Sequence, residues 1–232
     1  MKIENEVREF VHKYLDVSRE QEKTIVDYAL ATWLPLPPVL KYLHIIGGNG
    51  TGKTRAGVVM ESICFNAITA QGKATANSVI RLMDKNHPCT LIMDEADLLC
   101  QAEEDENGDS IRSTFEAILS VGAMKQTANI LRMEQEQPET YKPKAYNVHG
   151  YKVIISRKPF SDMAIASRCI VVRLKPKKLR LEIPQVLDDE FWQESEKIKK
   201  VLQEHFSRVV IVEGQAQAMA LNEQGIPAVS VG

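Results

Sequence analysis

The chain has 232 residues, 44% of them hydrophobic and 26% charged, and its formal net charge is −2. This size and composition predict one soluble globular domain with an appendage. No apolar run approaches the roughly 18–20 residues that cross a bilayer, and the charged, amphipathic N-terminus is unlike a signal peptide, so we expect no membrane association. The four cysteines form no C-x-x-C pair, which argues against a cysteine metal site and favours buried thiols in a reducing, cytoplasmic compartment.

Residues 1–38 predict a small helical prefix. Apolar side chains recur at helical spacing between Ile3 and Leu15. Ser18 and Gln21 match a capping box at the start of a second helix, and a cluster of prolines ends that helix. The apolar stripe favours packing against the rest of the chain, with contact to a neighbouring subunit as the alternative.

A glycine-rich segment directly follows a predicted buried strand at residues 42–46. It matches the pattern G-x-x-x-x-G-K-T through Gly47, Gly48, Asn49, Gly50, Thr51, Gly52, Lys53 and Thr54. Such glycines let backbone N–H groups converge on phosphate oxygens, while Lys53 adds positive charge and Thr54 offers a hydroxyl to Mg²⁺. A helix over 53–70 should begin here, and its dipole also favours an anion. We assign Arg55, in the first turn of this helix, to the same nucleotide site.

A second motif is the apolar run at residues 89–93, which ends in Asp94 and Glu95. A strand that carries an acid at its carboxyl end is how P-loop NTPases place a Mg²⁺-facing aspartate, so we assign Asp94 to the metal together with Thr54. Glu95 would orient and deprotonate the attacking water. Alone, this pattern also fits a strand that leads into a helix N-terminus, where acids suit the dipole. The upstream glycine loop strengthens the catalytic interpretation.

The order of these elements predicts an α/β fold. A short strand at 73–75 and a helix near 77–84 are expected between the two motifs. Strands that alternate with helices imply a parallel sheet with helices on both faces. An acidic loop at 101–109 should follow, and then a helix that Asp109 caps and Gly122 ends.

Residues 128–150 predict a β-hairpin inserted before the next core strand. It carries side chains that suit stacking on, and neutralising, single-stranded nucleic acid, namely Lys142, Lys144, Tyr146 and His149. A plain solvent-exposed hairpin is the alternative. Residues 157–180 carry eight Lys or Arg and one Asp, which suits either a phosphate backbone or a solvated surface.

Together these motifs resemble an AAA+-type ATPase, through GGNGTGKT, LIMDEAD, VIIS and SRC in that order. In such ATPases the strand beside the aspartate-bearing strand ends in a polar side chain that senses the γ-phosphate. Ser156 holds this place, Arg157 is the alternative sensor, and a serine that merely starts a turn is the simpler interpretation. The triplet around Arg168 is similar to the clamp-loader motif whose arginine reaches the ATP of a neighbouring subunit, which implies a trans-acting arginine finger. An ordinary surface arginine before a strand is the alternative.

The arrangement is still more similar to the ATPase modules of phage and plasmid primase-helicase proteins, over residues 1 to about 206. The tail, residues 209–232, resembles the opening β-α-β of a Toprim domain. Glu213 matches the first acid of that family, whereas Gln217 stands where the family usually has an aspartate. Because a Toprim site needs clustered carboxylates to hold Mg²⁺, we expect a truncated, non-catalytic segment here, with a plain β-α-β as the alternative.

We therefore expect four regions: a helical prefix at 1–38, a P-loop ATPase core at 39–182, a helical linker at 183–208 and the Toprim-like segment at 209–232. The resemblance implies an ATP-hydrolysing, DNA-associated motor of replication, such as a helicase or primase-associated ATPase. It would use ATP and Mg²⁺, act on single-stranded DNA, form a homo-oligomeric ring with ATP at subunit junctions, and work with a primase or other replication partner. The alternatives are a clamp-loader-like or remodelling ATPase that does not translocate, and a nucleotide-binding scaffold or decayed mobile-element fragment.

Overall fold

The computed structural model describes residues 2–71, 74–99, 103–104, 110–111, 114–137, 140–207, 210–212 and 228–230. Its helices are α1 (Lys2–Tyr14), α2 (Arg19–Ala31), α3 (Lys53–Ile63), α4 (Ala76–Lys85), α5 (Ala96–Leu99), α6 (Thr114–Val121), α7 (Met163–Ala166) and α8 (Asp189–Phe206). Its strands are β1 (Tyr42–Gly47), β2 (Ala67–Ala70), β3 (Thr90–Met93), β4 (Glu103–Glu104), β5 (Ser110–Ile111), β6 (Asn129–Gln137), β7 (Thr140–Asn147), β8 (Tyr151–Ser156), β9 (Cys169–Leu174), β10 (Val210–Val212) and β11 (Ala228–Ser230).

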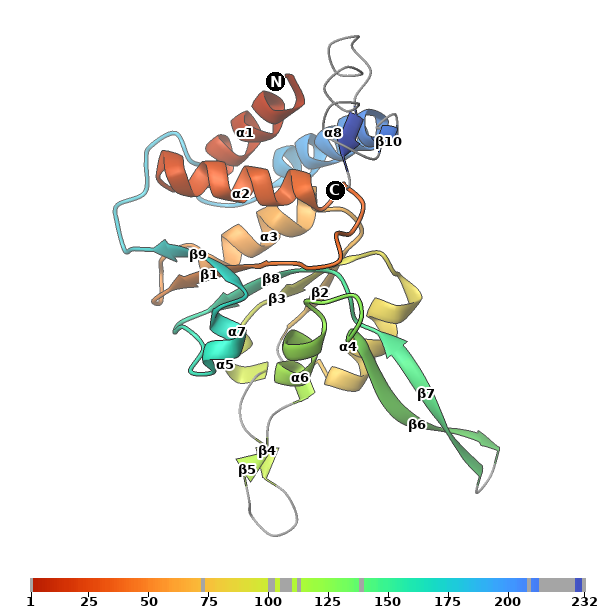
Figure 1. The fold of residues 1–232 in the computed structure, drawn as a ribbon. Coiled ribbons are helices and arrows are strands. Elements are labelled where there is room, and N and C mark those ends of the chain that lie inside the picture. Colours follow the sequence, from red (N-terminus) through yellow and green to blue (C-terminus); the bar gives the residue numbers. More distant parts are fainter. Residues whose placement is uncertain are drawn as a thin grey trace.

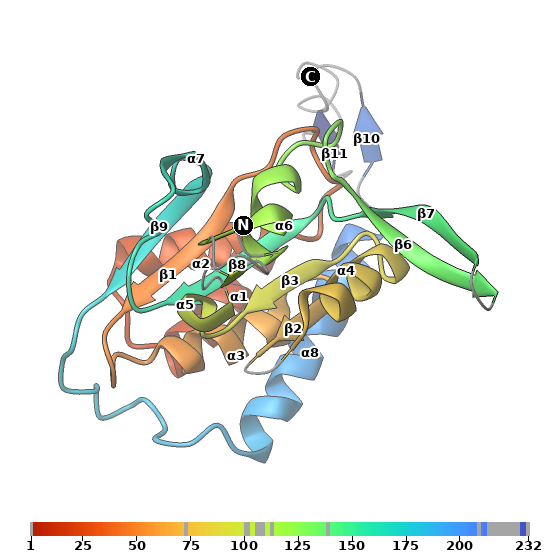
Figure 2. The same ribbon diagram turned by 90° about the horizontal axis from the view of Figure 1, so that it is seen from below.

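The centre of the molecule is a sheet with the strand order β2-β3-β8-β1-β9, in which neighbouring strands are parallel. Helices α1, α2, α3 and α8 lie on one face of this sheet, and α4, α5, α6 and α7 lie on the other (Figures 1 and 2). The expected α/β fold with helices on both faces is therefore confirmed. Strand β8, which ends at Ser156, lies between β1 and β3. Strand β1 leads to the glycine-rich loop, and β3 leads to Asp94.

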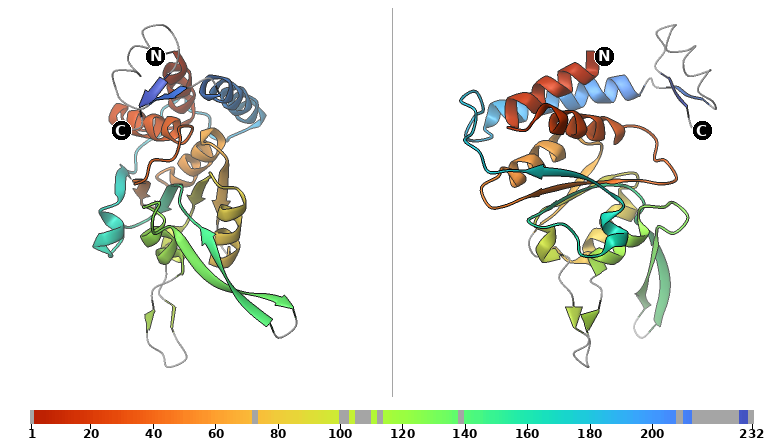
Figure 3. Two further views of the ribbon diagram at one scale, coloured as in Figure 1. Left: turned by 45° about the vertical axis from the view of Figure 1, so that its right-hand side comes forward. Right: turned by 60° about the vertical axis from the view of Figure 1, so that its left-hand side comes forward.

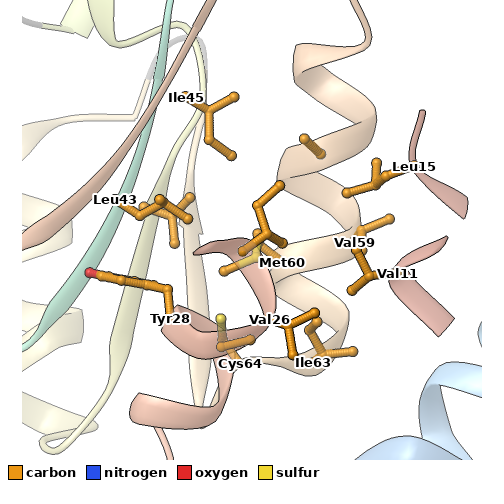
Figure 4. Close-up of a cluster of buried hydrophobic side chains, with 14 of the residues drawn as sticks. Val11, Leu15, Val26, Tyr28, Leu43, Ile45, Val59, Met60, Ile63 and Cys64 are labelled. Atoms are coloured by element: carbon orange, nitrogen blue, oxygen red, sulfur yellow. The ribbon is translucent and has the colours of Figure 1, made fainter. Parts of the chain in front are cut away.

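Two apolar cores hold these layers together, one on each face of the sheet. On the α3 face, side chains from the helical prefix pack directly on α3 and on β1, as Figure 4 shows for Val11, Val26, Val59, Met60 and Leu43. These residues are completely or almost completely buried. The helical prefix and the sheet therefore share one core. Each buried side chain of this kind contributes about 1.5–3 kcal/mol to stability.

The predicted helix over 53–70 is wrong in its second half. Helix α3 ends at Ile63, and Asn66 then adopts a left-handed conformation with φ of 43°. Asparagine tolerates this region better than most residues, so the chain turns there and Ala67–Ala70 forms β2 beside β3. The short strand expected at 73–75 is not found: Lys73 lies outside the described residues, and Ala74 and Thr75 are not in a strand, since Thr75 is the N-cap of α4.

Two later elements also differ in extent from expectation. Helix α6 begins at Thr114, and Ile111 lies in β5 instead. Asp109, the expected cap, lies outside the described residues. The predicted hairpin is present as β6 and β7, which pair from Asn129↔Asn147 to Gln137↔Thr140 and protrude from the α4 side (Figure 3).

In the tail, β10 and β11 pair in parallel, as a β-α-β unit requires. Glu213, Gln217 and the expected intervening helix lie outside the described residues. Within the described part of the chain, the structure contains no helix with the length and apolar character needed to cross a membrane.

Candidate functional site

The glycine-rich loop connects the carboxyl end of β1 to the start of α3. Gly50 and Gly52 have φ of 72° and 84°, a region that glycine enters at little cost. Thr51 Oγ1 donates to Gly48 O at 2.9 Å, and Ala56 N donates to Gly52 O at 2.9 Å, which starts the helix. The sequence motif thus has the strand–loop–helix setting that phosphate binding requires.

Close packing fixes the position of this loop. A Cβ added to the buried Gly47 would collide with Thr51 Oγ1 of the loop and lie 3.1 Å from Leu174 O of β9, so both neighbours favour a glycine here. Lys53 Nζ donates to Gly48 O at 2.7 Å, which places the ammonium group over the loop. Thr54, the next residue of α3, is exposed.

Asp94 and Glu95 follow the end of β3. Asp94 is only 8% exposed, its backbone N donates to Ala70 O, and its Oδ1 accepts from Glu95 N at 2.8 Å. Ile92 packs on the α3 face of the sheet, so by the alternation of a strand Asp94 faces that side as well. Glu95 is exposed and has φ of 55°, a conformation that costs a glutamate about 1–2 kcal/mol and is often found at functional sites.

These groups fit a magnesium–nucleotide complex in their chemistry. Mg²⁺ is usually held by one or two carboxylates together with water and substrate phosphates, and not by an all-protein cage. The Asp94 carboxylate and the Thr54 hydroxyl carry oxygen atoms of the kind that Mg²⁺ accepts. Among the described residues, no group of three or more His, Cys, Asp or Glu side chains is arranged to hold a metal ion without such help.

Ser156 ends the strand beside β3, as expected, and its Cα is paired with that of Ile46. Its hydroxyl, however, is buried: it donates to Lys158 O at 2.6 Å and lies 2.7 Å from His44 Nε2. Because the single hydroxyl proton goes to Lys158, Nε2 of His44 must carry a proton and donate. The structure therefore engages Ser156 within the protein and does not direct its hydroxyl to the glycine-rich loop from Gly47 to Thr54, which we call the phosphate loop.

Burial and charge around His44 are consistent with a neutral ring. Burial lowers the pKa of His44 to about 4, an effect that Asp97 opposes and Arg173 reinforces. Asp97 also accepts hydrogen bonds from the backbone N atoms of Arg157 and Lys158, at 2.7 and 3.3 Å. Arg157, the alternative sensor, has 52% of its side chain exposed and is the more accessible of the two candidates.

Arg168 lies at the opposite end of the sheet from the phosphate loop. It precedes Cys169, which is paired with Tyr42, whereas the loop follows Gly47, which is paired with Leu174. Its backbone O accepts from Tyr42 N at 2.8 Å. Five strand residues separate the two levels, a distance of about 17 Å. The structure therefore does not bring Arg168 to the phosphate loop of its own chain.

A cavity of about 580 Å³ opens beside the phosphate loop, a size typical of small-ligand sites. Its walls come from three distant parts of the chain: the turn between α1 and α2, the loop and first turn of α3, and the segment after β9. The lining residues are Leu15, Asp16, Val17, Ser18, Gln21, Gly50, Thr51, Gly52, Arg55, Ala56, Arg173, Leu174, Lys175, Lys177 and Leu179.

Sequence reasoning did not assign most of this wall to a site. It placed Ser18 and Gln21 in a capping box, which the structure shows, with Ser18 Oγ accepting from Gln21 N and Gln21 Oε1 accepting from Ser18 N. Gln21 Nε2 also donates to Arg173 O at 2.6 Å, which joins α2 to β9. Arg55 lines the cavity, but its guanidinium donates to Pro184 O and Gln185 O. The contacts of Gln21 with Arg173 and of Arg55 with Pro184 and Gln185 join distant parts of the chain, so no local sequence pattern marks them.

The hairpin differs from expectation in which side chains it exposes. Tyr146 and His149 are each 2% exposed, so neither can stack on a base. Lys144 Nζ lies 4.6 Å from the Tyr146 ring centroid and 3.9 Å from Glu134 Oε2. The outward face instead exposes apolar or aromatic side chains, with 57% exposure for Tyr141, 61% for Met133 and 67% for Leu131.

Comparison with known proteins yields a distant structural similarity. No protein-family model matches the chain, and no curated protein matches it. A solved structure of JCV helicase bound to a substituted acetamide is similar at 10% sequence identity and a TM-score of 0.42. The match covers 97% of this chain and 66% of the helicase chain, so this chain spans about two thirds of the length of that protein. Such a similarity does not determine function, which has to be inferred from the residues themselves.

Proposed function

We propose that this chain is an ATP-hydrolysing module that works on DNA in replication. One observation carries the proposal: a glycine-rich loop with Lys53 at the start of its helix lies at the same end of the sheet as Asp94 and Glu95. A phosphate-binding loop combined with an acid pair on a nearby strand is the arrangement that ATP hydrolysis needs. Neither motif alone would support this conclusion.

Each residue has a distinct role in the proposed reaction. The backbone N–H groups of the loop and the Lys53 ammonium bind the β- and γ-phosphates, and Thr54 and Asp94 would hold Mg²⁺. When bound, Mg²⁺ neutralises the phosphate charge and fixes the orientation of the phosphates. Glu95 accepts a proton from the attacking water. Arg168 from a neighbouring subunit stabilises the charge on the transferring group.

The cavity suits the nucleoside part of ATP. It is continuous with the phosphate loop, and the half-buried Val17 and the 40%-exposed Leu179 provide apolar surface on which a base can lie. Leu15 and Leu174 are at most 8% exposed and form the packed base of the cavity. Arg173 and Lys175 give the same cavity a basic edge, whereas the charge of Lys177 is paired with Asp16, and a basic edge favours a polyphosphate-bearing ligand.

Two surfaces support single-stranded DNA as the partner. In the basic segment 157–180, the exposed Lys158 and Lys178 offer cations for a phosphate backbone, and Tyr141 on the protruding hairpin offers an exposed ring for stacking. The position of Arg168 favours a homo-oligomeric ring with ATP at subunit junctions, since only a neighbouring subunit could bring this side chain to the nucleotide. A primase or another replication protein would be a further partner, through the Toprim-like tail at 209–232.

Steady-state ATP hydrolysis, measured with and without single-stranded DNA, tests the proposal. The blank is Lys53→Ala, and the matched control is Lys85→Ala, which removes an exposed lysine from the end of α4. We expect DNA-stimulated turnover that is lost in Lys53→Ala and kept in Lys85→Ala. Turnover indifferent to DNA would instead favour a remodelling ATPase, and nucleotide binding without any turnover would favour a scaffold. Strand displacement on tailed duplexes then separates a translocating motor from an ATPase that only switches state.

A further inference from the structure

A single irregular segment, residues 175–187, connects β9 to Asp188, the N-cap of α8 (Figures 1 and 3). We call it the strap. It passes the turn between α1 and α2, and three of its residues line the cavity beside the phosphate loop: Lys175, Lys177 and Leu179. Any ligand that fills this cavity would therefore contact the strap as well as the loop.

Asp16, in the turn between α1 and α2, holds the first half of the strap. Its side chain is 6% exposed, and its Oδ1 lies 2.6 Å from Lys177 Nζ and 3.1 Å from Arg180 Nε. Its Oδ2 accepts from Arg180 N at 2.9 Å. Burial alone would raise the pKa of Asp16, but Lys177 and Arg180 outweigh it and the pKa is lowered. The carboxylate is thus charged at neutral pH and binds two cations of the strap.

Arg180 also contacts the end of α1 and the start of the turn that carries Asp16. Its Nη2 donates to the backbone O atoms of His12 and Leu15, both at 3.0 Å, and its Nη1 lies 2.8 Å from His12 Nε2. Since an arginine can only donate, His12 Nε2 is an acceptor here. The guanidinium therefore fixes the strap to the end of α1 at three atoms.

Arg55 holds the second half of the strap. Its guanidinium donates to Pro184 O at 2.6 Å and to Gln185 O at 2.5 Å. Arg55 lies two residues after Lys53, in the first turn of α3, so this contact links the strap to the phosphate loop itself.

Little apolar burial holds the strap in place. Leu181 is 93% exposed and Val186 is 69% exposed, whereas Ile183 is 4% exposed and Leu187, at the end of the strap, packs partly buried against the α3 core. Polar contacts of the Asp16 and Arg55 kind can be exchanged for water when a segment lifts, at a much lower cost than unpacking a core. The strap is therefore built to open without disturbing the sheet.

We propose that the strap retains nucleotide in the cavity and that Asp16 is the positioning residue that fastens it. Opening of the Asp16–Lys177–Arg180 cluster would then control how fast nucleoside diphosphate leaves. This inference rests on the proposed ATP site and adds a step to it, because it concerns release and not hydrolysis.

Release of a fluorescent ADP bearing the N-methylanthraniloyl group tests the proposal. The protein is loaded with this ADP and Mg²⁺ and mixed with excess unlabelled ADP in a stopped-flow instrument. We expect Asp16→Asn to release it about tenfold faster, the change that loss of one charge-assisted hydrogen bond produces. Lys177→Ala, which alters a half-exposed side chain on the strap itself, should release it about threefold faster, and Lys177→Arg should restore slow release.

The control is Asp27→Asn, which removes a 47%-exposed carboxylate from α2 far from the strap contacts. It should leave the release rate unchanged. Melting temperatures without nucleotide separate a general loss of stability from a specific effect on release. If both Asp16→Asn and Lys177→Ala release the fluorescent ADP within twofold of the unmodified rate, the proposed role of the strap is wrong and the proposed ATP site is unaffected. Failure of the unmodified protein to bind the fluorescent ADP more tightly than Lys53→Ala would overturn both.

Discussion

The two ends of the parallel sheet carry different chemistry. At the carboxyl end lie the phosphate loop, Asp94 and Glu95, and at the amino end lies Arg168, about 17 Å away along β9. A parallel sheet gathers loops of one kind at one end, so a single chain can assemble phosphate-binding groups there without long insertions. The same geometry keeps Arg168 at the far end from the glycine-rich loop of its own chain, so under the proposed mechanism it could act only on the nucleotide of a neighbouring subunit.

The largest loss of activity is expected when Arg168, at the amino end of the sheet, is replaced. If Arg168 acts on a neighbouring subunit's ATP, Arg168→Ala should lower kcat for ATP about a thousandfold and change nucleotide affinity little. Arg19→Ala, at an exposed position that starts α2, is the control. Mixing Arg168→Ala with Lys53→Ala should recover part of the activity, because one of the two kinds of mixed junction combines the intact loop of the Arg168→Ala subunit with the intact arginine of the Lys53→Ala subunit. Full activity of Arg168→Ala alone would rule out the trans role.

At the carboxyl end, the largest effect is expected at Glu95. Glu95→Gln removes the proposed proton acceptor but keeps the size of the side chain, so hydrolysis should fall about a hundredfold or more while ATP still binds. Single-turnover phosphate release and fluorescent-nucleotide binding measure the two effects separately. The exposed Glu20→Gln serves as the control. Unchanged turnover in Glu95→Gln would remove Glu95 from the mechanism.

His44 lies in β1, on the face of the sheet opposite α3. Its burial should make the fold sensitive to acid. Its folded pKa is about 4 because of burial, whereas an unfolded histidine titrates near 6.5. The unfolded chain therefore binds a proton first as the pH falls. Stability should decrease from pH 6.5 towards pH 4 by up to about 1.4 kcal/mol per pH unit from this residue. Urea unfolding at several pH values should show a shallower loss in His44→Gln, and identical pH profiles would contradict the assignment.

The smallest expected effect is at Ser156. Because its hydroxyl donates to Lys158 O and accepts from His44, Ser156→Ala should lower the free energy of unfolding by about 1 kcal/mol. Urea unfolding measures this loss, with the hydrolysis rate measured on the same preparation. A large loss of hydrolysis with unchanged stability would instead support direct contact between Ser156 and the γ-phosphate.

The sequence predicted those parts of the site that are contiguous in the chain. The loop from Gly47 to Thr54 and the acids after β3 are short segments whose residue types follow from backbone geometry and charge. The end of α3 was mispredicted because Cys64 leaves the helix with an extended backbone, and the left-handed Asn66 then turns the chain into β2. Helical propensity summed over the following residues does not contain that information.

The cavity wall was missed for a different reason. Its central contact joins Asp16 to Arg180, which are 164 positions apart in the sequence. Which face of the hairpin points outward likewise depends on α4. Asn77 of α4 accepts a hydrogen bond from Arg132, and Arg81 of α4 donates one to Glu134, both on the inner face of the hairpin. Contacts of this kind leave no periodic trace in a single sequence.

The strand order has a consequence for how the chain folds. Strand β1, which leads to the phosphate loop, is flanked by β8 and β9, and both partners come more than 100 residues later in the chain. Pairing over such separations raises the contact order and slows folding. During synthesis, β1 has no strand partner until β8 emerges from the ribosome, and it is not enclosed until residue 174 follows. An amino-terminal fragment that ends before β8 would therefore contain the whole glycine-rich motif and still have no framework to shape it.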